Sequence, residues 1–400
     1  MYDTMNLRNM EIHYNIVDNN LLQSSEADEF YMNNRDLELT KELWQKLHHT
    51  PELSGQETKT KEILKEYLTN YTTLSVVETP DYLYTVYEEK DCEQPQLTIC
   101  LRADMDAIPD GEGGVFHGCG HDGHSAALFL AALCLERLRQ KGRKIGKRVI
   151  LLWQQAEETG EGARLACPVL LKESVSEIYG CHNIPGYPLG EVLLCKQVFA
   201  CASKGLILDL HGKQSHAAYP EQGINPGYLI AEIVNKLPIW CEDHKKGLTM
   251  ASIIEMKVGT ENFGISAGNG RLCLTLRAHY QEDLEMLTEA VLAYARQQAE
   301  TSGITMEVSE TDAFPDTVND TALTEKLEQL CIDHALPYTY LPGPMRWSED
   351  FGWYKKKCRG VFFGIGAGEE TPGLHTESYC YPEALLEKAG MIWETIIMHR

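Results

Sequence analysis

A short segment between residues 116 and 125 concentrates side chains that could bind a metal ion. It reads F-H-G-C-G-H-D-G-H-S and places a cysteine, three histidines and an aspartate around glycines that allow tight turns. Cys119 and His121 are two positions apart, so in an extended or bent segment their side chains can point to one side. A thiolate and an imidazole that converge suit a divalent cation such as zinc or manganese. A polar, His-rich loop with a buried cysteine is the alternative interpretation of this segment alone.

Segments further along the chain add carboxylates and histidines after short apolar runs. Glu157 and Glu158 follow the apolar run 148–153, which predicts a buried strand with the two glutamates at its carboxyl end. His182 stands in G-C-H-N-I-P and His375 in G-L-H-T-E. Two adjacent carboxylates in such surroundings are unfavourable unless a cation neutralises them. Each segment alone is a weak signal, but together they predict a metal centre.

Taken together, these motifs make the chain resemble the M20 metallopeptidase family. The resemblance is to its amidohydrolase branch, which contains hippurate hydrolases, N-acyl-amino-acid amidohydrolases and auxin-conjugate hydrolases. It covers roughly residues 37–400, and its combined motifs are too specific to arise by chance. The matching segments are L-H-H-T-P-E-L-S-G-Q-E-T, L-R-A-D-M-D-A-I-P, H-G-C-G-H-D-G-H-S-A, Q-Q-A-E-E, G-C-H-N-I-P-G-Y-P-L-G, H-G-K-Q-S-H-A-A-Y-P, S-E-D-F and L-H-T-E-S.

The resemblance implies a centre of two divalent metal ions, zinc or manganese foremost and cobalt or nickel as alternatives. The implied ligands are Cys119, His121, Glu158, His182 and His375. Glu157 would be the general base, because one glutamate must bind metal while its neighbour stays free to take a proton from the activated water. Asp106 matches the family's active-site aspartate and would orient a ligand, with a strand-end turn residue as the alternative. We assign His117 and His124 to packing or supporting hydrogen bonds.

Two residues in the middle of the chain match family positions that contact the substrate. His216, in G-K-Q-S-H-A-A, matches a histidine that stabilises the oxyanion, in some members from a partner subunit. Arg277, in L-T-L-R, matches an arginine that binds the free carboxylate of the substrate. For both, the alternative is a structural hydrogen bond on the surface. Relatives commonly read N-x-I-P where this chain reads F-G-I-S-A, so Gly264 takes the asparagine's place and substrate specificity stays open.

The pattern of apolar segments predicts an α/β protein with two domains after an N-terminal extension at residues 1–36. In the catalytic domain, residues 37–199 and 311–400, strand-like and helical segments alternate, which favours a central mixed sheet flanked by helices. Residues 200–310 resemble the family's lid, a smaller α/β sandwich inserted into the catalytic domain. The predicted strands are 97–102, 148–153, 204–210 and 272–279, and the predicted helices are 125–139, 226–236 and 282–302.

The first part of the catalytic domain, residues 37–72, predicts two helices around a turn at Pro51. Ser54 and Glu57 have the spacing of a capping box, in which each side chain bonds a free backbone N–H at the start of a helix. We therefore expect these two residues to cap the second helix.

Composition excludes several classes of protein. A net charge of −23 and a pI near 5.0 argue against binding to nucleic acid. The 13 cysteines include no C-x-x-C pair, which together with their odd number favours a reducing cytoplasm. The N-terminus lacks the pattern of a signal peptide, and no apolar segment approaches the ~18 residues of a membrane span.

We therefore expect a metal-dependent amidohydrolase that cleaves the amide bond of N-acyl amino acids or peptide-like small molecules. One alternative is a dipeptidase or carboxypeptidase of the same fold, although the usual aspartate of their second motif is replaced here by the cysteine of C-G-H-D. Another is a non-catalytic binding protein on this fold, although all six proposed metal and base positions are filled. A helix and an edge strand of the lid could also pair two subunits into a homodimer.

Overall fold

The computed structural model describes residues 32–89, 97–243 and 246–399. Residues 1–31 of the predicted N-terminal extension lie outside these ranges. The first helix, α1, begins at Asn34, with the side chain of Asn33 accepting a hydrogen bond from the N–H of Asp36 at its start. Asp36 is buried and forms an ion pair with Arg137, so the chain belongs to the folded domain from this helix onward.

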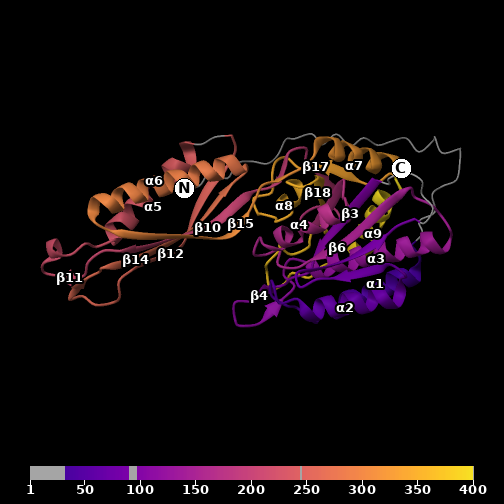
Figure 1. Ribbon diagram of the computed structural model, residues 1–400, viewed down its shortest axis with the longest axis horizontal. Helices are drawn as coiled ribbons and strands as arrows, with labels where there is room; N and C mark the ends of the chain where they lie inside the picture. The colour runs from indigo at the N-terminus through magenta and orange to yellow at the C-terminus, as the bar shows by residue number, and fades with distance from the viewer. Residues whose placement is uncertain (1–31, 90–96, 244–245, 400) are drawn as a thin grey trace. The chain divides into compact units, whose positions relative to one another are not determined.

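A mixed eight-stranded sheet forms the centre of the catalytic domain and confirms the predicted α/β class (Figure 1). The strands β6, β3, β7 and β18 are neighbours and run parallel, so their carboxyl ends meet at one edge of the sheet. In spatial order the strands are β1 (Ser75–Glu78), β2 (Tyr82–Tyr87), β6 (Lys147–Gln154), β3 (Leu97–Asp104), β7 (Glu177–Ile184), β18 (Arg359–Gly366), β8 (Val192–Leu194) and β17 (Tyr338–Tyr340).

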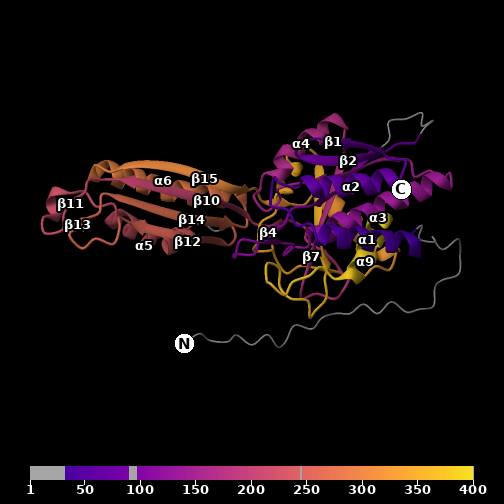
Figure 2. The ribbon, with the colours of Figure 1, turned by 90° about the horizontal axis from the view of Figure 1, so that it is seen from below.

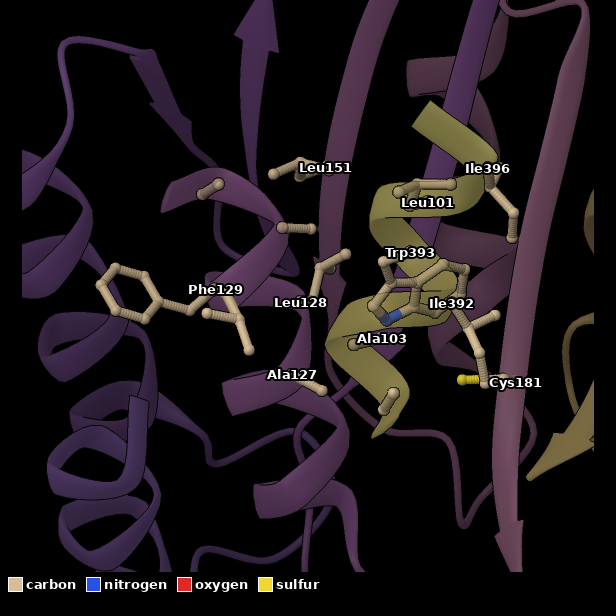
Figure 3. Close-up of a cluster of buried hydrophobic side chains, with 14 of the residues drawn as sticks. Leu101, Ala103, Ala127, Leu128, Phe129, Leu151, Cys181, Ile392, Trp393 and Ile396 are labelled. Carbon is tan, nitrogen blue, oxygen red and sulfur yellow. The ribbon is translucent and has the colours of Figure 1, made fainter. Parts of the chain in front are cut away.

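Helices cover both faces of this sheet, because its central strands are apolar on both sides. One face packs against α1 (Asn34–His48), α2 (Thr58–Tyr71), α3 (His121–Gln140), α7 (Thr321–Asp333) and α9 (Glu383–Met398). The other packs against α4 (Gly162–Lys172) and α8 (Gly352–Lys355). Figure 3 shows the first of these cores, where Leu128 of α3 and Trp393 of α9 lie beside the sheet. This packing fixes the start of α3 at the carboxyl edge.

The lid is a four-stranded antiparallel sheet with two helices on one face (Figure 2). Its strands in spatial order are β12 (Thr249–Val258), β14 (Asn269–Ala278), β10 (Ala202–His211) and β15 (Thr305–Phe314), and its helices are α5 (Gly227–Asp243) and α6 (Gln281–Ser302). The apolar residues of β10 and β14 alternate with polar ones, so one face is buried under the helices and the other is open. β15 continues four residues beyond the expected end of the lid at residue 310.

Short elements connect the two domains and form the remaining loops. They are β4 (Ile108–Pro109), β5 (Val115–Phe116), β9 (Val198–Ala200), β11 (Ser215–His216), the 3₁₀ turn Pro220–Gln222, β13 (Ile265–Ser266) and β16 (Thr317–Val318). None of the helices within the described ranges combines the length and apolarity needed to cross a membrane.

Candidate active site

The five proposed ligands come together at the carboxyl edge of the catalytic sheet. Four segments at this edge deliver them: the turn that leads into the first residue of α3 carries two, and the loop after β6, the end of β7 and the loop after β18 carry one each. The side chains are those of Cys119, His121, Glu158, His182 and His375. Residues far apart in the chain therefore meet at one site: Cys119 and His375 are 256 positions apart.

Cys119 is the shared member of two overlapping groups of side chains that could hold a metal ion. One group is Cys119 with His121 and His182, and the other is Cys119 with Glu158 and His375. The Cys119 Sγ lies 3.3 Å from His182 Nε2 and 3.4 Å from His375 Nε2. The His375 Nε2 lies 3.4 Å from Glu158 Oε1. Two triads that share one sulfur are the donor arrangement expected for a pair of adjacent cations.

The ring nitrogens of two histidines are oriented for metal binding by hydrogen bonds on their far sides. His121 Nδ1 lies 2.9 Å from Asp106 Oδ1, and His182 Nδ1 lies 2.7 Å from the backbone oxygen of Asn183. These contacts leave Nε2 of each ring facing the cluster. His121 Nε2 and Glu158 Oε1 are buried, lie 3.9 Å apart and have no hydrogen-bond partner within the described part of the chain. The site thus has unsatisfied donor atoms of the types that a divalent cation binds.

Electrostatics inside the cluster also favour a bound cation. Burial raises the pKa of the Cys119 thiol well above its usual range, and the carboxylates of Glu158 and Glu157 add to the shift. Burial likewise raises the pKa of Glu157, with Glu349 and Glu158 adding to it. Burial lowers the pKa of His182, which keeps its ring neutral as a ligand must be. The anionic groups disfavour one another, so their ionised forms need positive charge from a bound ion.

Glu157 and Glu158 both approach His121, with Glu157 Oε2 at 4.0 Å and Glu158 Oε1 at 3.9 Å from its Nε2, and a strained residue precedes them. Ala156 has φ of 54°, in the left-handed region that residues with a side chain seldom adopt. Its N–H donates to Glu57 Oε1, and the N–H of Glu158 donates to Asp106 Oδ2. Glu157 is buried, and its Oε1 accepts a hydrogen bond from the N–H of Asp350 at 3.2 Å. The turn thus presents Glu158 to the triad while Glu157 lies beside it.

The predicted capping box at the start of α2 is wrong. The N-cap is Glu57, whose own side chain makes no capping hydrogen bond, and the carboxylate of Glu52 accepts hydrogen bonds from the N–H groups of Lys59 and Thr60. Ser54 Oγ instead donates to Asp106 Oδ2 at 2.7 Å, and Glu57 accepts from the backbone of the glutamate turn. Burial raises the pKa of Glu57 to about 7, with the charge of Asp106 adding to the shift. Both residues support the candidate site, because tertiary partners compete successfully with the helix end for their oxygens.

Sequence reasoning missed a buried charge cluster beneath the site. Arg102 is fully buried, and its guanidinium contacts Asp104 at 2.8 Å, Glu349 at 3.0 Å and Asp350 at 2.8 Å. Asp350 also accepts hydrogen bonds from Gln154 and from the N–H of Ala163, which fixes the segment that donates to Glu157. The signal was an arginine inside the apolar strand L-R-A-D, since a buried arginine requires carboxylate partners.

The two histidines beside the ligands make supporting contacts. His124 Nδ1 lies 2.7 Å from Asp104 Oδ1, and its ring contacts Asn183 on the other side. His117 Nε2 lies 3.2 Å from the backbone oxygen of Leu47. Neither completes one of the triads that contain Cys119. His124 also lies with Asp104 and His121 in another group of possible ligand atoms, so the assignment of this histidine to packing and hydrogen bonding stays a prediction.

The two proposed substrate residues lie at opposite ends of the lid sheet. Arg277 on β14 lies opposite Ser203 in the strand register, at the start of β10. Its Nη1 donates to Ser348 Oγ at 2.7 Å. His216 lies beyond the other end of β10, exposed in the small β11–β13 sheet, and Ala217 N donates to the backbone oxygen of Gly264 there. A ten-residue strand spans roughly 30 Å. Among the described residues, His216 has no recorded contact with the ligand cluster.

Comparisons with known proteins agree with the fold and the motifs. A family model described as Peptidase family M20/M25/M40 matches residues 100–399. An uncharacterized hydrolase of Staphylococcus saprophyticus is 27% identical over 383 residues, which cover 90% of this chain and 97% of the relative.

Two crystal structures share the fold at low sequence identity. The Bacillus subtilis YXEP protein, described as a dinuclear metal-binding peptidase from the M20 family, has a TM-score of 0.77 and 21% identity, covering 92% of this chain and 98% of its own. A tripeptidase from Staphylococcus aureus has a TM-score of 0.70 and 17% identity, covering 91% of this chain and 99% of its own.

Proposed function

The chain belongs to peptidase family M20/M25/M40, and from that premise we propose that this hydrolase is a metal-dependent amidohydrolase that cleaves N-acyl amino acids. The observation that carries the proposal is the pair of triads that share Cys119, with the buried carboxylate of Glu157 beside them. A cysteine at this position favours the amidohydrolase branch over the dipeptidases, whose second motif usually carries an aspartate there.

The proposed mechanism assigns separate tasks to the side chains at the site. Two divalent cations, held by Cys119, His121, Glu158, His182 and His375, would supply a Lewis acid for the scissile carbonyl and would lower the pKa of a water molecule. Glu157 would accept a proton from the attacking water, whose oxygen bonds to the carbonyl carbon, and would pass that proton to the amide nitrogen as the C–N bond breaks. Asp106 holds the His121 ring through Nδ1 and the Glu158 turn through its backbone N–H.

A substrate panel tests the proposed reaction. N-acetyl and N-benzoyl amino acids, dipeptides and tripeptides are incubated with protein reconstituted with manganese or zinc, and the released amine is measured. We expect N-acyl amino acids to be cleaved with the highest kcat/KM. Preferred cleavage of dipeptides would support the peptidase alternative. Binding without cleavage of any compound would support the non-catalytic one.

We also propose that two copies of the chain associate through their lids. Strand β12 is at the edge of the lid sheet, where its backbone can pair with another strand. It exposes large apolar side chains, including Ile254 at 65% and Met256 at 57%, and Phe263 in the loop before β13 is 93% exposed. Apolar side chains in such a cluster favour a protein–protein contact. A second lid paired with β12 would cover them.

His216 could act from the partner subunit in such a dimer. Its Nδ1 accepts a hydrogen bond from the N–H of Ala218 at 3.0 Å, which leaves Nε2 as a donor on the exposed side. We expect His216→Ala to lower kcat at least ~10-fold with metal content unchanged, as for the loss of one oxyanion donor. His211→Ala, at another exposed lid histidine, serves as the control and should keep full activity.

Mixing two inactive variants separates action within one subunit from action across subunits. Glu157→Gln and His216→Ala proteins are combined under conditions that exchange subunits. Recovered activity would show that the histidine works across the dimer, because one site then has both residues intact. A His216→Ala enzyme as fast as the parent on its best substrate would remove the histidine from the mechanism.

A further inference from the structure

Two arginines lie together where the lid meets the catalytic domain, and neither is paired with a carboxylate of the residues that the structure describes. Arg277 Nη1 donates to the backbone oxygen of Arg346 at 2.9 Å and to Ser348 Oγ. Arg346 is exposed, and its Nη2 contacts only the Met250 sulfur, at 2.7 Å, among the described hydrogen-bond partners. By contrast, Arg271 on the same strand as Arg277 is paired with Asp209 and Glu255.

Two neighbouring arginines without a described carboxylate partner are unusual in a chain that carries 59 acidic and 36 basic residues. Burial lowers the pKa of Arg277, and the positive charge of Arg346 adds to the shift. Two guanidinium groups that repel each other would be stabilised by an anion held between them. Planar guanidinium groups bind carboxylates through two parallel hydrogen bonds, which makes a dicarboxylic ligand the natural partner of such a pair.

The arginine pair is connected directly to the candidate metal centre. Arg346 is followed by Trp347, whose ring centroid lies 5.2 Å from that of the ligand His182. Three residues further on, the N–H of Asp350 donates to the proposed base Glu157. Arg346 is thus adjacent in the chain to a residue that contacts a proposed ligand, and its segment continues to the residue that donates to Glu157.

We propose that Arg346 binds the side-chain carboxylate of an acidic amino acid, so that the preferred substrates are N-acyl derivatives of glutamate or aspartate. Arg277 takes the α-carboxylate, which every N-acyl amino acid has, and Arg346 selects among amino acids by their side chains. This inference rests on the proposed hydrolysis of N-acyl amino acids and adds its substrate class.

The test compares N-acetylglutamate with N-acetylglutamine, which differ in charge and hardly in shape. N-acetylglutamine cannot form the charge-assisted hydrogen bonds that a carboxylate makes with a guanidinium group, so we expect the parent enzyme to favour N-acetylglutamate at least ~10-fold in kcat/KM. Arg346→Gln should reduce that preference to less than about threefold, because kcat/KM should fall for N-acetylglutamate and stay the same for N-acetylglutamine. Arg271→Gln removes the same charge from the same strand as Arg277 and should leave the preference unchanged.

Failure of this inference can be distinguished from failure of the proposed function. Hydrolysis of both compounds at equal kcat/KM would overturn the role of Arg346 and leave the amidohydrolase assignment standing. If neither is hydrolysed, calorimetry on the Glu157→Gln protein compares the binding of glutamate and glutamine themselves. Tighter binding of glutamate that Arg346→Gln abolishes would support the acidic-ligand site, and equal affinities would overturn it.

Discussion

Replacing Glu157 by glutamine is expected to lower kcat at least ~100-fold while metal content stays close to that of the parent, since loss of a general base typically has that effect. The carboxylate is buried beside the ligand cluster and belongs to neither triad that contains Cys119. Glutamine keeps the size of the side chain and its acceptor for the N–H of Asp350. The measurements are steady-state kinetics on the best substrate and elemental analysis of the same samples.

Two matched variants show whether this effect is specific. Glu161→Gln changes an exposed glutamate a few residues further along, which is paired with Arg164, and should leave kcat and metal content unchanged. Glu158→Ala should lower metal occupancy, because Glu158 contributes Oε1 to a triad with Cys119 and His375. Equal loss of metal in the Glu157 and Glu158 variants, with no selective loss of kcat in the former, would refute the division of tasks between them.

Removing the metal is expected to abolish measurable turnover and to destabilise the fold. Charge stabilisation by a metal ion is worth several kcal/mol in the transition state, so chelation should lower kcat/KM by at least ~100-fold. Metal present at about 100 times its Kd stabilises the folded state by about 2.7 kcal/mol, which for a chain of 400 residues corresponds to a fall in Tm of roughly 3 °C on removal. Manganese or zinc added back should restore both.

Cysteine variants provide the control for this experiment. In the Cys119→Ser variant, chelation should no longer lower Tm, because Cys119 is common to both triads. Cys273→Ser, at a cysteine on the lid sheet, should respond to chelation like the parent. Full activity of the parent after exhaustive chelation would be incompatible with the proposed chemistry.

The fold and the ligand cluster were predictable because their determinants are local in sequence. The apolar runs before Asp104 and Gln154 mark strands β3 and β6, and parallel strands necessarily bring their carboxyl ends to one edge. The glutamate pair Glu157 and Glu158 directly follows β6, and the turn that holds Cys119 comes between β3 and α3, so their meeting agrees with the strand order, whereas the ligand set itself was implied by the family resemblance.

The support beneath the site could not be predicted, because its contacts join residues that no local pattern connects. Arg102 and Asp350 are 248 positions apart, and either could have been a surface residue. Ser54 and Glu57 fit a capping box by spacing, yet both oxygens bond across the domain to Asp106 and the Ala156 turn. Tertiary hydrogen bonds of this kind depend on the packed arrangement of the strands and not on sequence periodicity.

The most direct test of the two-metal centre is anomalous diffraction from crystals of the protein loaded with manganese or zinc. We predict two anomalous peaks about 3.5–4 Å apart, the separation usual for paired catalytic ions, with the Cys119 sulfur in contact with both. His121 and His182 should bind through Nε2, the nitrogen that the contacts to Asp106 and Asn183 leave facing the cluster. No peak among these side chains, or peaks that the Cys119 sulfur does not contact, would contradict the proposed centre.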